Sequence, residues 1–346
     1  MSYKRFDQQD VVISAESVTS TVFSNGVTEQ TVFITSSTQV AGASGEYYYN
    51  VYQTASNDST AAVQFSLAYA DEKGSGSAYF NTAVTGSTPS ATVYGQYRSL
   101  VLADEEDSFI FGDYSGSYFY AISIERSRYK EKLLPGTLAL TLKCPDNANE
   151  RIVLTDNSNQ VTTTTFTDAG RVFELVTGSL GTVVTSGNFN NSSGYTKDGT
   201  FGSYGKFLPD VGLILLNGAA LDATGSAGGI TLGTTRGNNA NGANPGKIFN
   251  AIVDGGSFKL NGEETVSSNL VFVRARNAEF NYSSNPSNTS GSGELRHDVM
   301  INSPQSYITT VGLYNDNNDL LATAKLSKPL LKDFTKEALV RIKLDY

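Results

Sequence analysis

The chain has 346 residues, of which 39% are hydrophobic and 17% charged, and its formal net charge is −9. Its 18 Phe and 19 Tyr can fill a folded core, which excludes global disorder. The 33 Gly and the long Ser/Thr/Asn-rich stretches favour short strands joined by turns. The composition excludes a coiled coil, a collagen repeat and a disulfide scaffold, and the acidic charge makes nucleic acid a poor partner. We therefore predict a mainly β fold of antiparallel, sandwich-like sheets in two β-rich parts, with one or few short helices.

The first ten residues lack the apolar segment of a signal peptide. The longest apolar run, residues 213–216, is far too short to span a bilayer. We therefore expect neither a signal peptide nor a membrane partner.

Alternating apolar positions in the first half of the chain predict strands at residues 117–124 and 137–142. One helix is predicted between them. Residues 93–107 place Tyr94, Tyr97, Leu100 and Val101 at helical spacing and then run into four consecutive acids. This pattern predicts a short amphipathic helix followed by a solvated loop.

Residues 145–149 interrupt the strand pattern with Pro, Asp and Asn, which predicts a domain boundary there. The expected parts are an N-terminal β-rich domain, residues 1–145, and a C-terminal β-rich domain, residues 150–346. Two stretches rich in Gly, Asn and Ser, residues 186–205 and 225–244, are predicted to be long surface loops. Between them, residues 207–221 are expected to form an apolar strand segment.

The C-terminal end has the clearest pattern. Residues 307–315 and 320–327 flank an Asn/Asp turn and predict a β-hairpin. Residues 338–345 alternate apolar and charged side chains, and an apolar strand of this kind is normally paired because a free edge invites aggregation. We expect this last strand to be built into a sheet, either of this chain alone or shared with a partner.

The sequence is poor in reactive groups. Cys144 and His297 are the only residues of their types, so a His-based zinc site, a Cys–His dyad and an intrachain disulfide lack their parts. Phosphate-binding glycine loops are missing too. We therefore predict no catalytic, cofactor-binding or metal-binding residues and no cofactor. A pair of carboxylates among the 34 acids stays open as the basis of a glycoside hydrolase.

Basic residues are the candidates for an interface. From residue 320 onward there are six Lys or Arg against three Asp or Glu, a net charge of +3, which leaves −12 for the rest. Such a dipolar chain can dock onto a neighbour's acidic patch. A second group of basic residues occupies every second position from residue 126 to residue 132. If the preceding strand continues through this segment, these side chains are expected to line one face of it. For the C-terminal group a solvated strand face is the favoured interpretation, and for the second group it explains the pattern equally well. The interface candidates are Arg126, Arg128, Lys130, Lys325, Lys328, Arg341 and Lys343.

Several segments carry a family resemblance. At the C-terminal end these are TTVGLYND (309–316), LLATAKLSKP (320–329) and VRIKLDY (340–346). Three more are FNYSSNP (280–286), RSRYKEKLLPG (126–136) and GSYGKFLPDVG (202–212). Together they resemble virion structural proteins of large contractile-tailed bacteriophages, notably T4-like myoviruses of the marine, cyanophage type. The segments cover only part of the chain, and none of them is a catalytic motif.

The resemblance implies a non-enzymatic component of the particle, in the tail or baseplate, made in the host cytoplasm. Its expected partners are other virion proteins, in repeated copies set by particle symmetry, contacted through sheet edges, termini and loops. Two alternatives stay open. One is a host-receptor-binding or adhesive virion protein that uses residues 186–244, and the other is a glycan-degrading tail enzyme with a carboxylate pair.

Overall fold

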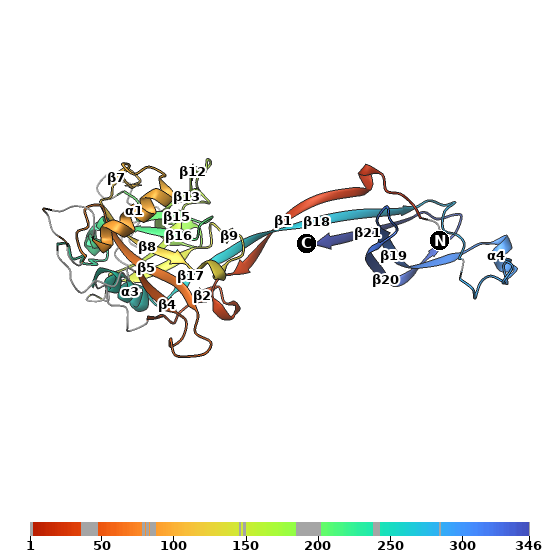
Figure 1. The fold of residues 1–346 in the computed structure, drawn as a ribbon, viewed down its shortest axis with the longest axis horizontal. Helices are drawn as coiled ribbons and strands as arrows, with labels where there is room; N and C mark the ends of the chain where they lie inside the picture. The colour runs from red at the N-terminus through yellow and green to blue at the C-terminus, as the bar shows by residue number, and fades with distance from the viewer. Residues whose placement is uncertain are drawn as a thin grey trace. The chain divides into compact units, whose positions relative to one another are not determined.

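The structure is a computed structural model that describes residues 3–35, 48–77, 80, 83, 88–144, 147, 150–184, 202–237, 243–283 and 285–345. The protein is mainly β, with 44% strand and 15% helix, which confirms the predicted fold class (Figure 1). The chain divides into two compact units. The large unit comprises residues 18–264, and the small unit combines residues 1–17 with residues 265–346.

This division differs from the expected parts, residues 1–145 and 150–346. The strands on either side of the expected boundary, β10 (Ala139–Lys143) and β11 (Arg151–Asp156), pair antiparallel inside the large unit, with Leu140 opposite Leu154. Turn-forming residues mark a break in a strand, but they do not distinguish a connection between paired strands from a linker between domains. Here they lie between paired strands.

The large unit is built on one sheet, which curls into a half-barrel of eleven strands. Its order is β2-β17-β10-β11-β13-β15-β16-β8-β5-β4-β3, and β12 and β14 are additional partners of β13. The strands not yet given are β2 (Glu29–Gln30), β3 (Ile34–Thr35), β4 (Tyr48–Tyr52), β5 (Val63–Asp71), β8 (Tyr118–Ile124), β12 (Thr165–Thr167), β13 (Gly170–Ser179), β14 (Thr182–Val183), β15 (Gly205–Leu208), β16 (Leu213–Asn217) and β17 (Phe258–Lys259). Outside this sheet are the hairpin β6 (Ile110–Phe111) and β7 (Tyr114–Ser115), the strand β9 (Lys132–Leu133), and the 3-10 turns η2 (Ser24–Gly26), η3 (Arg126–Arg128) and η4 (Gly225–Ala227).

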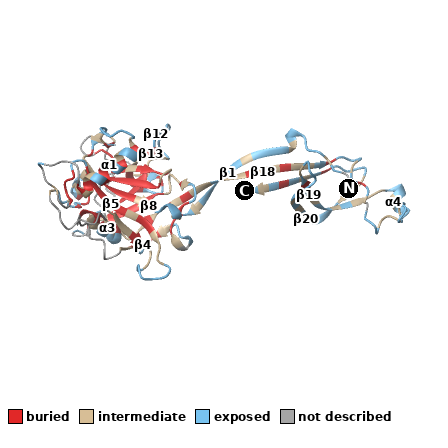
Figure 2. Cartoon of the chain, viewed as in Figure 1, coloured by how far each residue is buried: buried red, intermediate tan, exposed pale blue. Residues whose placement is uncertain are grey.

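Helices and aromatic side chains cover both faces of this sheet, so its central strands are buried on both sides (Figure 2). On one face, the helix α3 (Ala243–Gly255) packs Ile248 and Ile252 into the cluster that contains Leu140 of β10. On the other face, the helix α1 (Pro89–Val101) packs against Phe119 of β8 and Leu215 of β16. A sheet with two covered faces explains why its strands have apolar side chains at consecutive positions.

The predicted helix is confirmed with shifted bounds. The helix α1 begins at Pro89, a residue suited to the first turn because its missing N–H has no partner to lose there. Tyr94, Tyr97 and Val101 are buried, as their spacing predicts, whereas Leu100 is 45% exposed. The helix ends before the exposed acids at 104–107.

The prediction of one apolar strand over residues 207–221 is wrong. The segment forms the hairpin β15–β16 and continues into the short helix α2 (Gly218–Asp222), whose first amide groups are capped by the Asn217 side chain. Pro209 and Asp210 lie in the connection between the two strands, and Asp210 accepts a salt bridge of 2.6 Å from Arg171. The apolar pattern ran across a turn because the residues on both sides of it are buried.

Of the first predicted loop, residues 186–201 lie outside the described residues. The second, residues 225–244, is described apart from 238–242, and it is not a simple surface loop. It contains the turn η4, buries Ile230 and Leu232 in the core, and leads into α3.

A close backbone contact in the large unit requires glycine at position 202. The Ser203 N–H donates to the Phe111 carbonyl at 3.2 Å, and Gly202 has φ +70°, in the left-handed region. A Cβ at this position would overlap the Phe111 carbonyl oxygen, which is part of the backbone and cannot rotate away.

We therefore expect Gly202→Ala to lower the free energy of unfolding by about 2 kcal/mol or more. The matched control is Gly95→Ala in α1, where an added Cβ meets no atom within 4 Å. This control should be neutral or stabilising by up to about 1 kcal/mol, because Ala favours helix over Gly. Urea unfolding of both variants measures the difference, and equal stabilities would contradict the prediction.

The small unit contains the sheet β1-β18-β21 and a separate hairpin. Its strands are β1 (Val11–Thr21), β18 (Asn261–Ala275), β19 (Ser306–Tyr314), β20 (Leu320–Lys332) and β21 (Ala338–Asp345), with the short helical turns η1 (Gln8–Asp10) and α4 (Val299–Asn302). The boundary with the large unit falls within β1 and β18. The predicted hairpin is confirmed as β19–β20. The last strand is paired as predicted, with β21 opposite β18 from Ser268↔Asp345 to Ala275↔Ala338.

The hydrophobic core of the small unit contains few buried residues. Its buried cluster consists of Val271, Leu313 and Ile342, with partly buried side chains from β18, β21 and the hairpin around it. A buried polar contact fixes the end of β20, where the Lys332 ammonium donates to the Asn281 Oδ1 at 2.7 Å and to two backbone carbonyls. One face of the sheet therefore packs on one face of the hairpin.

Candidate functional site

The predicted basic stripe at residues 126–132 does not form. Residues 126–128 form the 3-10 turn η3, closed by the Arg128 N–H donating to the Glu125 carbonyl, so the strand β8 does not continue. Arg126 folds back to donate to the Tyr129 and Lys130 carbonyls, and its guanidinium lies 4.7 Å from the Tyr129 ring centroid. The three candidates of this group, Arg126, Arg128 and Lys130, are engaged within the large unit, Arg128 with Ser24 and Lys130 with Glu264.

The basic residues of the C-terminal segment lie on two strands. Lys325 and Lys328 are exposed on β20, and Arg341 is exposed on β21. Lys343 forms ion pairs with Glu16 at 3.1 Å and with Asp345 at 3.3 Å. Hydrogen bonds and charge from these two acids raise the pKa of the Lys343 ammonium. The surplus of positive charge in this segment is therefore partly neutralised inside the small unit.

Exposed apolar side chains mark the small unit instead. Among the described residues, 25 large hydrophobic side chains are exposed, and 16 of them lie in the small unit, which has 99 of the 346 residues. A concentration of exposed large hydrophobic side chains in one unit is typical of a surface that binds a partner. We call these residues the apolar surface of the small unit: Tyr3, Phe6, Val11, Val12, Ile13, Phe280, Tyr282, Val299, Ile301, Tyr307, Tyr314, Leu320, Leu321, Leu330, Phe334 and Leu339.

The strand β1 shows this exposure most clearly. None of its eleven described residues is buried, and the consecutive residues Val11, Val12 and Ile13 are 37%, 45% and 75% exposed. Successive side chains of a strand point to opposite faces, so both faces of β1 present apolar groups to solvent. The segment before β1 is held in place, because Lys4 donates to the Arg274 carbonyl at 2.7 Å and forms an ion pair with Glu279.

Sequence reasoning did not single out β1. Its signal is an apolar triplet at residues 11–13 followed by Ser and Thr, which fits a buried strand as well as an exposed one. Burial is a property of the packed chain, so the exposed triplet is visible in the structure alone.

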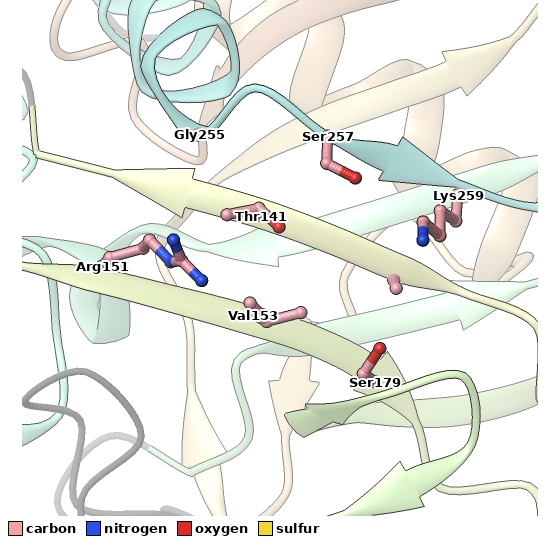
Figure 3. Close-up of a pocket in the computed structure, with 8 residues that line it drawn as sticks. Thr141, Arg151, Val153, Ser179, Gly255, Ser257 and Lys259 are labelled. Atoms are coloured by element: carbon pink, nitrogen blue, oxygen red, sulfur yellow. The ribbon is translucent and has the colours of Figure 1, made fainter. Parts of the chain in front are cut away.

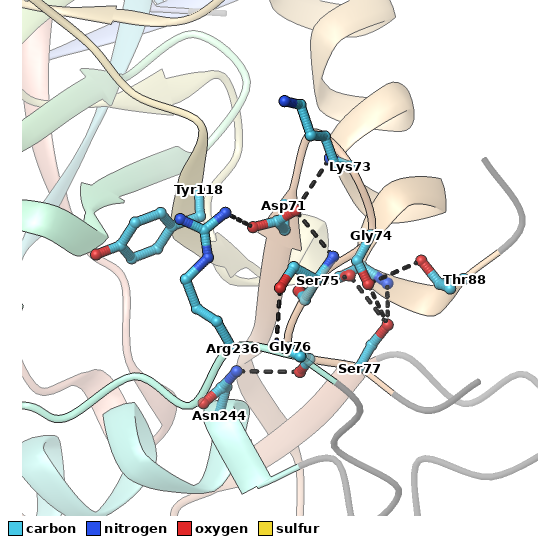
Figure 4. A network of polar contacts seen from close by, with 12 residues as sticks. Asp71, Lys73, Gly74, Ser75, Gly76, Ser77, Thr88, Tyr118, Arg236 and Asn244 are labelled. Carbon is cyan, nitrogen blue, oxygen red and sulfur yellow. Dashed lines mark hydrogen bonds and ion pairs between the residues drawn. The ribbon is translucent and has the colours of Figure 1, made fainter. Parts of the chain in front are cut away.

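A network of polar contacts surrounds Asp71 in the large unit (Figure 4). The Asp71 carboxylate has no exposed surface and accepts from the Arg236 guanidinium at 2.8 Å. It also accepts from the backbone N–H groups of Lys73 and Ser75 at 3.0 and 2.9 Å. The Arg236 guanidinium lies 4.9 Å from the Tyr118 ring centroid. Asp71 thereby joins the end of β5, the turn that follows it and the distant segment that carries Arg236.

A second carboxylate extends the network. The Tyr118 hydroxyl donates to Asp222 Oδ2 at 2.8 Å, and Asp222 Oδ1 accepts from the N–H and the hydroxyl of Thr234, both at 2.8 Å. Burial and the negative charge of Asp222 raise the pKa of the Tyr118 hydroxyl. Burial likewise raises the pKa of the Tyr69 hydroxyl nearby. The carboxylates of Asp71 and Asp222 are therefore occupied by fixed protein donors, an arrangement that holds segments together.

A shallow pocket of about 320 Å³ lies on β10, β11 and β17 (Figure 3). Basic and hydroxyl side chains surround it, with Arg151 and Lys259 accompanied by Thr141, Ser179 and Ser257. The Glu29 carboxylate binds two of these pocket residues: it forms an ion pair with Lys259 at 3.2 Å and accepts a hydrogen bond from the Ser257 hydroxyl at 2.6 Å. These hydrogen bonds lower the pKa of Glu29 against the opposing effect of burial.

The two residues of single occurrence belong to different units. Cys144 is a buried free thiol, and His297 is exposed just before α4. Within the described part of the chain, no group of three or more His, Cys, Asp or Glu side chains is placed to hold a metal ion. Among the same residues, no helix has the length and apolar character needed to cross a bilayer.

Comparison with known proteins returns no match: no family model, no curated protein and no solved structure corresponds to this chain.

Proposed function

We propose that this protein is a non-enzymatic structural component of a contractile-tailed phage particle, in the tail or baseplate. It assembles with other virion proteins through its small unit. The observation that carries the proposal is the apolar surface of the small unit, which exposes 16 large hydrophobic side chains around a core of three buried ones.

The contrast with the large unit supports an assembly role. The large unit has two extensive buried clusters, one on each face of its sheet. The small unit has 99 residues but only one small buried cluster, and it leaves much of its apolar surface in water. Full burial of one large apolar side chain contributes roughly 1.5–3 kcal/mol, so covering even a few of these residues is strongly favourable.

The resemblance to virion structural proteins points in the same direction. Three of its segments lie on β19, β20 and β21, which belong to the small unit, and Tyr314, Leu320, Leu321 and Leu339 are exposed on these strands. Exposed sheet edges and apolar side chains are what a building part needs to join its neighbours.

Immunogold labelling of purified particles, with antibodies raised against the chain, tests the proposal. We expect label on the tail or baseplate in a regular pattern and peptides of the chain in the mass spectrum of the particles. Label confined to exposed fibre tips would favour the adhesive alternative, and absence from particles would contradict the proposal.

The enzymatic alternative has its own test. Purified protein incubated with peptidoglycan or host polysaccharide should release no sugar. Release that a single Asp or Glu substitution abolishes would overturn the non-enzymatic assignment.

A further inference from the structure

We infer that the apolar surface of the small unit is covered by the small unit of a second copy of this chain. The inference rests on the proposed function and names the first partner in the assembly. It is argued from the distribution of charge, from the edges of the sheet and from the deficit in the core.

Charge permits the small units to associate with one another. The small unit carries 11 Lys or Arg and 11 Asp or Glu, a net charge of zero, while the large unit carries 14 and 23, a net charge of −9. Two large units therefore repel each other, whereas two small units do not. Zero net charge together with exposed apolar groups promotes association.

The outer strands of the β1-β18-β21 sheet carry charges of opposite sign. In this sheet both β1 and β21 have β18 as their partner. Arg341 and Lys343 lie on β21, and Glu16 lies on β1. Within one copy Lys343 already pairs with Glu16 at 3.1 Å, so Arg341, which is exposed, is the basic side chain of β21 that can meet a second copy. Placing β21 of one copy beside β1 of another brings Arg341 to the strand that carries Glu16.

The small size of the buried cluster in the small unit favours a second copy of the chain over any other partner. The apolar surface needs cover as soon as the chain folds, before any particle exists. Another copy of the same chain is always present at equal concentration, and it offers the same unburied residues in return. Each copy can therefore complete the core of its neighbour.

Analytical ultracentrifugation of the full chain over a range of concentrations tests the inference. The unmodified protein should sediment as an oligomer that dissociates on dilution. Ile13→Lys, at the most exposed large hydrophobic side chain of β1, should weaken association at least about tenfold, because an unpaired charge would be buried in the contact. The matched control is Phe166→Lys on β12 of the large unit, where the side chain is 68% exposed, and it should associate like the unmodified chain.

A second measurement does not depend on the variants folding. Hydrogen exchange of the unmodified chain should show amides of residues 11–17 that become more protected as concentration rises. A monomer at every concentration, with unchanged exchange in β1, would overturn the inference and leave the proposed function to the labelling of particles. Equal weakening by both Lys variants would also overturn it. Self-association of a chain absent from particles would instead contradict the proposed function.

Discussion

Ending the chain at Lys336 is expected to unfold the small unit and to leave the large unit folded. The deletion removes β21 and with it eight paired positions opposite β18. It also removes Ile342, one of the three buried residues of the small cluster, and the buried Ala338. The loss is of the order of 5 kcal/mol, comparable with the whole stability of a small domain.

Hydrogen exchange with mass spectrometry measures this effect region by region. We expect residues 265–336 to lose protection in the truncated chain, while β5 and β8 keep theirs, because the buried clusters of the large unit contain no residue beyond 264. The exposed edge of β18 should make the truncated protein aggregate or fail to enter particles. Leu339→Ser is the control for the exchange pattern alone, since this side chain is 60% exposed and its replacement keeps the strand. Persistent protection of residues 306–332 would show that the hairpin is stable without β21.

Local elements of the fold could be predicted from the sequence. The β19–β20 hairpin and the strand β21 were found because alternation of side chains and an Asn/Asp turn are short-range signals. The helix α1 was found for the same reason, through the spacing of Tyr94, Tyr97 and Val101. Such signals fix the type of an element but not its partners.

The division of the chain could not be predicted in this way. The small unit joins residues 1–17 to residues 265–346, and no local pattern states that β1 lies beside β18. Register and pairing between distant strands depend on the complete packing of both. The same limit explains residues 126–132, where alternating basic residues suggested a continued strand, although hydrogen bonds of Arg126 to nearby carbonyls stabilise a turn.

The candidate surface shows the limit most clearly. Charge is visible in the sequence, so basic residues such as Lys325, Lys328 and Arg341 were chosen as interface candidates. Exposure of Val12, Ile13 or Leu321 is not visible, because an apolar residue in a strand is normally buried. The structure therefore moves the emphasis from basic residues to apolar ones, and the role of the basic candidates stays a prediction.

Asp71→Ala is expected to destabilise the large unit by about 3 kcal/mol, which is the second large effect. The substitution leaves the backbone N–H groups of Lys73 and Ser75 without their acceptor at a site with no solvent access for the carboxylate. Arg236 loses its ion pair as well, but its side chain is 46% exposed and regains water, so this part of the cost is small. Urea unfolding measures the combined loss in the free energy of unfolding. Asp113→Ala, at an exposed aspartate of the same unit, is the control, and it should change stability by no more than about 0.5 kcal/mol.

The same variant separates folding of the large unit from association through the small one. Asp71 belongs to the large unit and Ile13 to the small unit. At temperatures where both remain folded, Asp71→Ala should therefore sediment like the unmodified chain, whereas Ile13→Lys should not. If Asp71→Ala instead weakens association as strongly as Ile13→Lys, the contact between copies depends on the large unit. The apolar surface of the small unit would then be an insufficient explanation for assembly.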